Sequence, residues 1–233
     1  MRKFSVFLLA LTLILFTSGM ASALTLQSVD GEWTDWVGGS SVITTTASVA
    51  YGNTNEDQIR WGTGPSGQSG LGFTGVVPDP GFLAFNPGDP FEIGQLRHFN
   101  NPIGSSNQAA STAELTVDLD FASGSGSFIF DFGIDETPNT GAGCCDDFIF
   151  FPMSVPEQSI DLGPNGKFFL ELLGFGPDDE TFVSQFQSPE GSTNETLVWA
   201  RLNPIPEPAT VLLLGSGLLG LTAIGRKKFF KKS

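Results

Sequence analysis

The fold is decided by residues 114–134, ELTVDLDFASGSGSFIFDFGI. Two stretches within it alternate apolar and polar residues with a period of two, which is typical of strands that bury one face. Residues 114–121 place four apolar side chains on one face, and residues 127–134 repeat the pattern with Phe128, Phe130 and Phe132. The Ser/Gly-rich segment between the two stretches is typical of a hairpin connection. The sequence therefore predicts an antiparallel hairpin at the centre of the chain.

Other stretches of strand character surround this hairpin. We expect strands over residues 41–49, 148–153, 167–173, 181–187 and 195–202, and a type I′ turn at Asn165-Gly166. Residues 51–91 are rich in turn-forming residues and are expected to form long loops with one or two strands. No 3.6-residue period is sustained here, so the sequence predicts an all-β fold. The expected architecture is a jelly-roll-like antiparallel β-sandwich with much of its core from the 22 phenylalanines.

Residues 1–23 have the features of a secretory signal peptide. A basic start at Arg2 and Lys3 precedes an apolar stretch, and small residues end in Ala21-Ser22-Ala23. Cleavage is expected before Leu24, and a retained N-terminal anchor is disfavoured because the apolar stretch is short. The exported β-domain is therefore expected over residues 24–202.

Residues 203–233 form a separate segment with three parts. A Pro-Glu-Pro linker (203–208) precedes an uncharged apolar run (209–225) and a basic tail (226–233). As a helix, Ala209 to Ile224 would span roughly 24 Å, the short limit for a hydrocarbon core. We expect a transmembrane helix there, with the basic tail in the cytoplasm and the β-domain on the other side.

This segment resembles the PEP-CTERM sorting signal of bacterial surface proteins, through Pro206, Glu207 and Pro208, the short helix and the basic end. The resemblance implies recognition of the triplet by an exosortase, a membrane-embedded processing enzyme that removes the helix. It also implies that the protein is held in the inner membrane with its domain outside the cytoplasm, and is at the cell surface or extracellular after processing. The alternative is a permanent membrane anchor.

The predicted exported domain is strongly acidic. It holds four of the eleven basic residues against 24 of the 25 acidic ones, a net charge of −20. Nucleic-acid binding is excluded, because phosphate contacts need basic patches. The two cysteines, Cys144 and Cys145, are adjacent. They can form a vicinal disulfide in an oxidising compartment, pair with other chains, or remain as thiols.

The single histidine lies in residues 94–103, GQLRHFNNPI. This stretch resembles the Thr-His-x-Asn motif of a family of PEP-CTERM surface proteins and the "choice-of-anchor" exported β-domains, with His98 and Asn100 matching and Arg97 in place of Thr. The resemblance implies a fold and a location and no reaction. From the residues alone, we expect His98 to be a structural residue in a turn, its ring bonded to a loop carbonyl. No catalytic residue is predicted, since no nucleophile signature accompanies the histidine.

A group of acidic residues follows the hairpin. Its members are Asp131, Asp135, Glu136, Asp146 and Asp147. Flexible loops with several carboxylates can hold Ca²⁺, so these five are candidate calcium ligands, although a solvated acidic rim is the favoured interpretation. No other cofactor is predicted.

Two classes of function remain. The first is a non-enzymatic cell-surface or matrix protein, which the resemblance associates with exopolysaccharide and biofilm. The second is a carbohydrate-binding or carbohydrate-active protein, in which Trp33, Trp36, Trp61 and Tyr51 would stack on sugars if exposed. Buried aromatic residues beneath a flat acidic face would count against it. Carboxylates about 5–9.5 Å apart in an aromatic cleft would favour the enzyme.

Overall fold

The computed structural model describes residues 23–48, 55–77, 81–104, 108–139, 145–151, 158–205 and 215–217. Thirteen strands and a 3₁₀ helix, η2 (Gly163–Asn165), account for most of them. The strands are β1 (Leu24–Gly38), β2 (Ile43–Ser48), β3 (Asn55–Trp61), β4 (Ser69–Gly75), β5 (Leu83–Phe85), β6 (Pro90–Asn100), β7 (Ala110–Phe121), β8 (Gly124–Asp135), β9 (Asp147–Phe150), β10 (Ser159–Asp161), β11 (Lys167–Gly176), β12 (Gln185–Ser188) and β13 (Ser192–Pro204).

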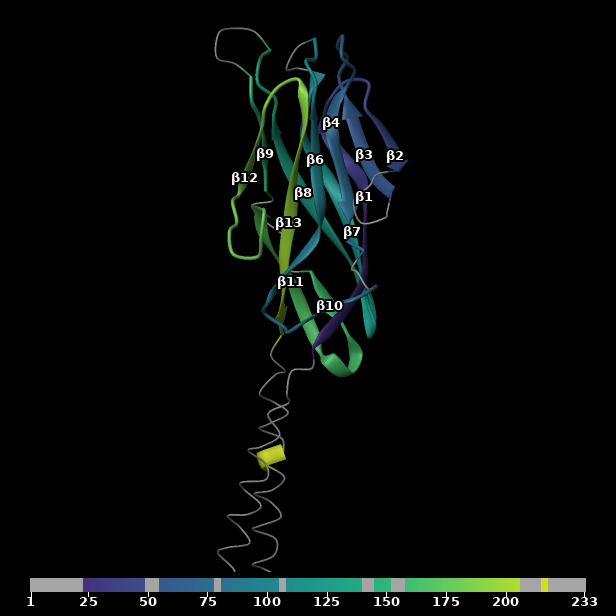
Figure 1. Cartoon of the computed structure of the whole chain (residues 1–233). Coiled ribbons are helices and arrows are strands. Elements are labelled where there is room, and N and C mark those ends of the chain that lie inside the picture. The colour runs from purple at the N-terminus through teal and green to yellow at the C-terminus, as the bar shows by residue number, and fades with distance from the viewer. Residues whose placement is uncertain are drawn as a thin grey trace, which may run out of the picture.

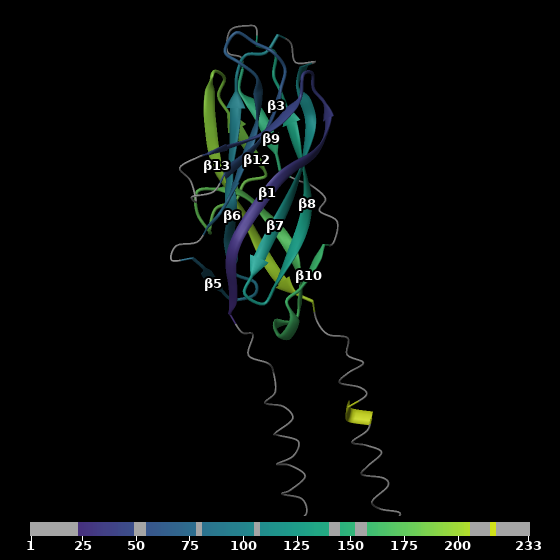
Figure 2. The same ribbon diagram turned by 90° about the vertical axis from the view of Figure 1, so that its right-hand side faces the viewer.

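The strands form two sheets. The first has the order β12-β9-β8-β7-β1-β5, the second β10-β11-β13-β6-β4-β3-β2. All strand pairings are antiparallel. The sheets pack face to face with their strands along the long axis of the domain (Figure 1), and the turned view shows β1, β7 and β8 side by side (Figure 2). The predicted all-β antiparallel sandwich is therefore confirmed.

The predicted central hairpin is formed by β7 and β8. Its pairing continues to Phe121 opposite Gly124, so the connecting loop is only Ala122-Ser123. Apart from the exposed Ile129, the large apolar residues of both strands face inward, as the alternation predicts. The outward face carries Asp118, Asp120 and other polar residues. This hairpin thus provides the middle of the first sheet.

Phenylalanine supplies much of the core. Six of the seven largest fully buried side chains are phenylalanines, and the seventh is Trp61. Phe132 of β8 stacks on Phe175 of β11 with ring centroids 6.1 Å apart, and Phe151 meets Phe175 edge-on at 5.0 Å. Such aromatic pairs contribute beyond their buried area, and this group joins the two sheets.

Two local predictions are wrong. Residues 51–91 hold β3, β4, β5 and the start of β6 rather than mainly loops. The glycines of β4 weaken the alternating pattern by which that strand could be predicted. Gly72 is needed for packing, because a Cβ there would lie 2.6 Å from the carboxyl carbon of Glu56. Asn165-Gly166 is no type I′ turn, because only Gly166 has a positive φ, of 97°. There the 3₁₀ helix forms the turn between β10 and β11.

The longest strand, β1, lies in a stretch where the sequence predicts none. It pairs with β7 through three register irregularities, which interrupt the simple alternation of its residues. Of the other predicted strands, residues 181–187 form a strand only from Gln185, with an isolated bridge at Val183.

The start of β1 and the end of β13 lie at the same end of the sandwich (Figure 1). Residues 1–22 of the predicted signal peptide, and Pro206, Glu207 and Pro208, lie outside the described residues. Of the predicted transmembrane helix, residues 215–217 are described, and they are helical. Among the described residues no helix has both the length and the apolar character to cross a membrane.

Candidate functional site

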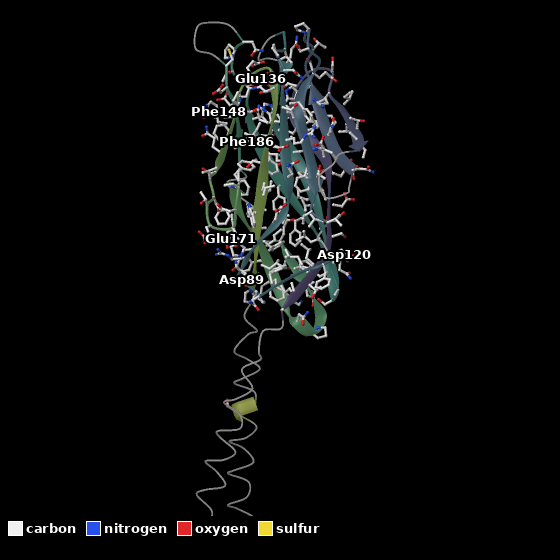
Figure 3. All side chains as sticks on the ribbon, in the orientation of Figure 1. Asp89, Asp120, Glu136, Phe148, Glu171 and Phe186 are labelled. Atoms are coloured by element: carbon white, nitrogen blue, oxygen red, sulfur yellow. The ribbon has the colours of Figure 1, made fainter. Side chains whose placement is uncertain are left out.

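Three polar side chains meet between the two sheets at one end of the sandwich. His98 comes from β6 of the second sheet, Glu136 directly follows β8, and Asp147 begins β9 of the first sheet. One nitrogen or oxygen atom of each lies within 4.8 Å of the corresponding atoms of the other two, and all three residues are buried. We call these three residues the buried polar cluster. Glu136 lies at the end of the domain opposite the one where β1 starts (Figure 3).

Strand alternation explains why these residues face inward. Glu136 continues the inward row of Phe128, Phe130, Phe132 and Ile134 by one further step. Asp147 likewise shares its face with the buried Ile149, and His98 shares its face with the buried Leu96. Each residue of the cluster is therefore a polar residue placed where the pattern calls for an apolar one.

Hydrogen bonds fix one oxygen of each carboxylate. Asp147 Oδ1 accepts from the backbone nitrogen of Thr137 at 2.8 Å and from its hydroxyl at 3.3 Å, which ties the start of β9 to the segment after β8. The Ser69 hydroxyl lies 2.9 Å from the Phe99 carbonyl oxygen and 3.4 Å from Glu136 Oε2. Its single hydrogen therefore serves Glu136 weakly.

With both carboxylates charged, the remaining polar atoms of the cluster have no hydrogen-bond partner among the described residues, although a proton on one acid lets Glu136 and Asp147 share a hydrogen bond. These atoms are both ring nitrogens of His98, Glu136 Oε1 and Asp147 Oδ2. Both carboxylate oxygens of Glu190, in the turn between β12 and β13, are also buried and unpartnered. An unsatisfied buried polar group lowers the stability of a protein by about 1–3 kcal/mol. The presence of several such groups in one place therefore requires an explanation.

Burial and like charges raise the acid pKa values of the cluster. Desolvation is the main cause of the raised pKa of Glu136, and the charge of Asp147 adds to it. Burial also raises the pKa of Asp147, although the hydrogen bonds from Thr137 oppose the shift. Burial, together with the charge of Asp147, raises the pKa of Glu190 to about 7. Without a bound cation, Glu136 is therefore the member of the cluster that holds a proton at neutral pH.

The histidine supplies no compensating charge. Burial, assisted by the charge of Arg60, lowers the pKa of His98 to about 3, so its ring is neutral at physiological pH. The indole of Trp61 faces Glu136 and lowers its pKa slightly, but its Nε1 forms no hydrogen bond of normal geometry. The site thus combines a neutral imidazole with several carboxyl groups.

Asn100 connects the cluster region to the turn before β13. Its Nδ2 donates to the Ser188 carbonyl oxygen at 2.7 Å, and the Ser188 hydroxyl accepts from Asn194 Nδ2 at 2.8 Å. These bonds hold the turn that carries Glu190. Asn100 therefore acts as a structural residue that positions this turn.

The five acidic candidates do not lie in one place. Glu136 and Asp147 join the cluster, whereas Asp131 and Asp135 are exposed and Asp146 accepts a hydrogen bond from Gln187 at 2.5 Å. The structure instead adds His98, which lies in β6 and not in a turn, with no bond from its ring to a carbonyl. That expectation for His98 is wrong because the residue occupies an inward strand position.

Sequence reasoning missed the meeting of His98 with the acids and the role of Glu190. The available signal was the parity of the residue number along a strand: each of the cluster residues is a polar residue at a position that continues a row of inward-facing apolar residues. Arg97, which stands where the resembled motif has Thr, faces the other side of the sheet and pairs with Glu56 at 3.0 Å.

The aromatic residues are mostly buried. Trp33 and Trp61 are 3% and 0% exposed, Trp36 is 37% exposed, and Tyr51 lies outside the described residues. A shallow depression of about 130 Å³ adjoins Trp33 and is otherwise lined by polar residues of β1, β2 and β3. No free cysteine occurs among the described residues, and Cys144 lies outside them, so the state of the Cys144–Cys145 pair stays a prediction.

The fold and site define an acidic antiparallel β-sandwich with a buried polar cluster at one end. Residues 204–228, which begin at the last residue of β13, match the family model of the PEP-CTERM protein-sorting motif. This match supports export and surface sorting through an exosortase-type system, and it implies processing by an exosortase-like enzyme. A comparison with curated proteins gave no match.

Proposed function

We propose that this chain is a non-enzymatic surface or matrix protein, delivered by its sorting motif and associated with extracellular polysaccharide. The observation that carries the proposal is the motif match at residues 204–228, directly after the sandwich. The start of β1 and the end of β13 lie at the same end of the sandwich (Figure 1). A domain anchored through the motif would therefore point the other end, where Glu136 lies, away from the membrane (Figures 1 and 3).

Burial of the polar cluster supports a non-enzymatic role. His98 and Asp147 are 0% exposed and Glu136 is 7% exposed, which leaves no access for a polymeric substrate to their reacting atoms. A glycosidase places its two carboxyl groups on either side of the scissile bond, with the sugar between them. The cluster has its ligand atoms within 4.8 Å of one another beneath the surface, an arrangement better suited to structure than to hydrolysis.

Carbohydrate binding is the second candidate, and the depression beside Trp33 is the feature that favours it. Its walls include Glu32, Asp57 and three threonines of β2, which could donate and accept hydrogen bonds to a sugar. However, Trp33 offers almost no exposed ring face, and its Nε1 already donates to the Asp57 carbonyl oxygen at 2.9 Å. This candidate therefore ranks below a structural role.

Intact-mass measurement of the protein from the envelope and medium of its own host tests the sorting proposal. A chain that starts at Leu24 and ends near Pro206–Pro208 is expected, with or without added mass. A chain that retains residues 209–233 would reduce the motif to a permanent anchor. Co-sedimentation with the host's purified exopolysaccharide tests the association, and equal recovery with and without polymer would contradict it.

A further inference from the structure

We propose that His98, Glu136 and Asp147 bind a divalent transition-metal ion, with Zn²⁺ the best match to the donor set, and that the ion fastens the two sheets together. The inference rests on the buried polar cluster and is independent of the sorting proposal. The proposed site differs from the calcium candidate of five carboxylates. It keeps Glu136 and Asp147, and a nitrogen of His98 takes the place of the other three acids.

The geometry suits a small ion. In a tetrahedral zinc site with ligand distances near 2.1 Å, neighbouring ligand atoms lie about 3.4 Å apart. The three atoms of the cluster already lie within 4.8 Å of one another. Closing the remaining gap requires side-chain shifts of about an ångström.

The unpartnered atoms point to a missing ligand. The His98 ring is fully buried and neither of its nitrogens has a hydrogen-bond partner among the described residues. One free oxygen on Glu136 and one on Asp147 are in the same condition. A metal ion would satisfy one atom on each of the three residues at once, whereas a single proton could satisfy only one pair of them.

The charges around the cluster also indicate a bound cation. All four basic side chains of the described region are engaged elsewhere: Arg97 with Glu56, Lys167 with Asp161, Arg201 with Glu171, and Arg60 over the Phe99 ring. The cluster therefore has two buried carboxyl groups and no protein cation. A divalent ion bound by neutral His98 would neutralise both carboxylates.

The mixed donor set selects the metal. Imidazole is a preferred ligand of zinc and other late first-row ions, whereas calcium favours an all-oxygen shell of six to eight ligands. Three protein ligands leave a fourth tetrahedral position for water or for Glu190, whose two oxygens are buried and unpartnered nearby.

The position of the site gives the ion a structural role. One ligand belongs to β6 of the second sheet, and the other two flank the connection between β8 and β9 of the first sheet. A bound ion would therefore join the sheets at the end remote from the start of β1 (Figure 3). Because it binds only the folded protein, it raises the unfolding temperature.

The full chain, without an affinity tag, would be purified in mild detergent, stripped with EDTA and titrated with ZnCl₂. We expect one Zn²⁺ per chain, a rise of several degrees in unfolding temperature, and tetrahedral d–d absorption bands when Co²⁺ replaces Zn²⁺. Glu136→Gln should weaken Zn²⁺ binding by about 100-fold or more. The matched control Asp135→Asn, its exposed neighbour, should leave binding unchanged.

The wild-type measurements decide the proposal even if a variant fails to fold. Absence of stoichiometric Zn²⁺ uptake would overturn it. So would equal uptake by Glu136→Gln, since the site would then lie elsewhere. Stabilisation by Ca²⁺ with none by Zn²⁺ would overturn the assignment of the metal and of His98 as a ligand. An octahedral Co²⁺ spectrum would contradict the proposed coordination.

Discussion

Buried carboxylates lie on both sides of the second sheet: Glu56 is on its outer face, and Glu136 and Asp147 of the first sheet lie against its inner face. Glu56, whose side chain is 0% exposed, lies on the outer face with Arg97 Nε at 3.0 Å and a short hydrogen bond from Gln58. The buried polar cluster lies on the inner face. Arg97 and His98 are consecutive residues of β6, so strand alternation alone separates the two environments.

The two environments differ in the sign of the neighbouring charges. Burial raises the pKa of Glu56, while the charges of Arg97 and Arg60 lower it. Burial also raises the pKa of Glu136, but there the charges of Asp147 and Glu190 raise it further. Glu56 therefore carries its counter-ion within the fold, and the cluster depends on a proton or an ion from solution.

The largest effect is expected from Arg97→Ala. It removes the counter-ion of a fully buried carboxylate and should lower the free energy of unfolding by about 3 kcal/mol. Urea denaturation provides the measurement. Adding Glu56→Gln should recover much of the loss, because the uncompensated charge is then gone.

The matched control for that experiment is Arg201→Ala. Arg201 pairs with Glu171 at 4.0 Å, and both side chains are about a third to a half exposed, at 34% and 47%. Its loss should cost less than about 1 kcal/mol. Equal losses for the two arginine variants would show that burial of Glu56 makes no difference to the strength of its pairing.

Neutralising one acid at each place should give opposite results. In EDTA at pH 8, Glu136→Gln should raise the free energy of unfolding by about 1–2 kcal/mol, because it removes a buried, repelled charge at nearly constant volume. Glu56→Gln should lower it by a similar amount, since Arg97 loses its partner. Urea midpoints of the two variants under the same conditions test this, and a change of the same sign in both would contradict the comparison.

The pH dependence of the metal-free protein follows from the same shifts. Glu136 and Glu190 have folded-state pKa values above the ordinary 4.5, about 7 for Glu190, so they bind protons more tightly when folded. Their contribution is complete below about pH 4.5 and is lost as the pH rises through the raised values. His98, with its pKa lowered to about 3, has the opposite sign: its contribution is present above 6.5 and is lost as pH falls towards 3.

The expected profile in EDTA therefore has its maximum near pH 4.5, because above that pH the raised carboxyl groups outnumber His98, and it declines by about 2 kcal/mol towards pH 8. Asp147 and Arg60 are the other charged groups that act on these residues, and both are included in the stated shifts. Urea midpoints measured from pH 4 to 8 provide the test. The decline should shrink in Glu136→Gln, and a continued rise of stability to pH 8 would contradict the assignment.

The sequence was sufficient for the sandwich because alternation is strong where it matters most. In β7 and β8 nearly every second residue is apolar, and both strands form where predicted. It was insufficient for β1 and β4, where glycines replace side chains for steric reasons. A Cβ on Gly31 would lie 2.4 Å from the Phe73 ring, so the glycine that weakens the strand pattern is required by the packing between the sheets.

The buried polar cluster could not be predicted from local pattern alone, because its three residues are brought together by the stacking of two sheets. His98 and Asp147 are 49 positions apart in the sequence and belong to different sheets. The acidic residues around the end of β8 do indicate a group of carboxylates. However, only the alternation of inward and outward positions along the strand distinguishes the buried Glu136 from the exposed Asp135. Parity at the ends of strands is the signal to apply to related sequences.

The smallest effect tests that parity argument directly. Asp135→Asn changes the residue next to Glu136 in the same chemical way as Glu136→Gln, but on the exposed face of the strand end. Its charge raises the pKa of Asp147 only as the least of several causes, so the variant should alter the free energy of unfolding by less than about 0.5 kcal/mol. Any change in the metal-free protein should be a slight gain in the free energy of unfolding, because one repulsive charge is removed near Asp147.

Urea denaturation of Asp135→Asn and Glu136→Gln in parallel measures the difference. If Asp135→Asn matched Glu136→Gln, the charge repulsion would be spread over the whole acidic end of the domain, and burial would not distinguish the cluster from its surroundings.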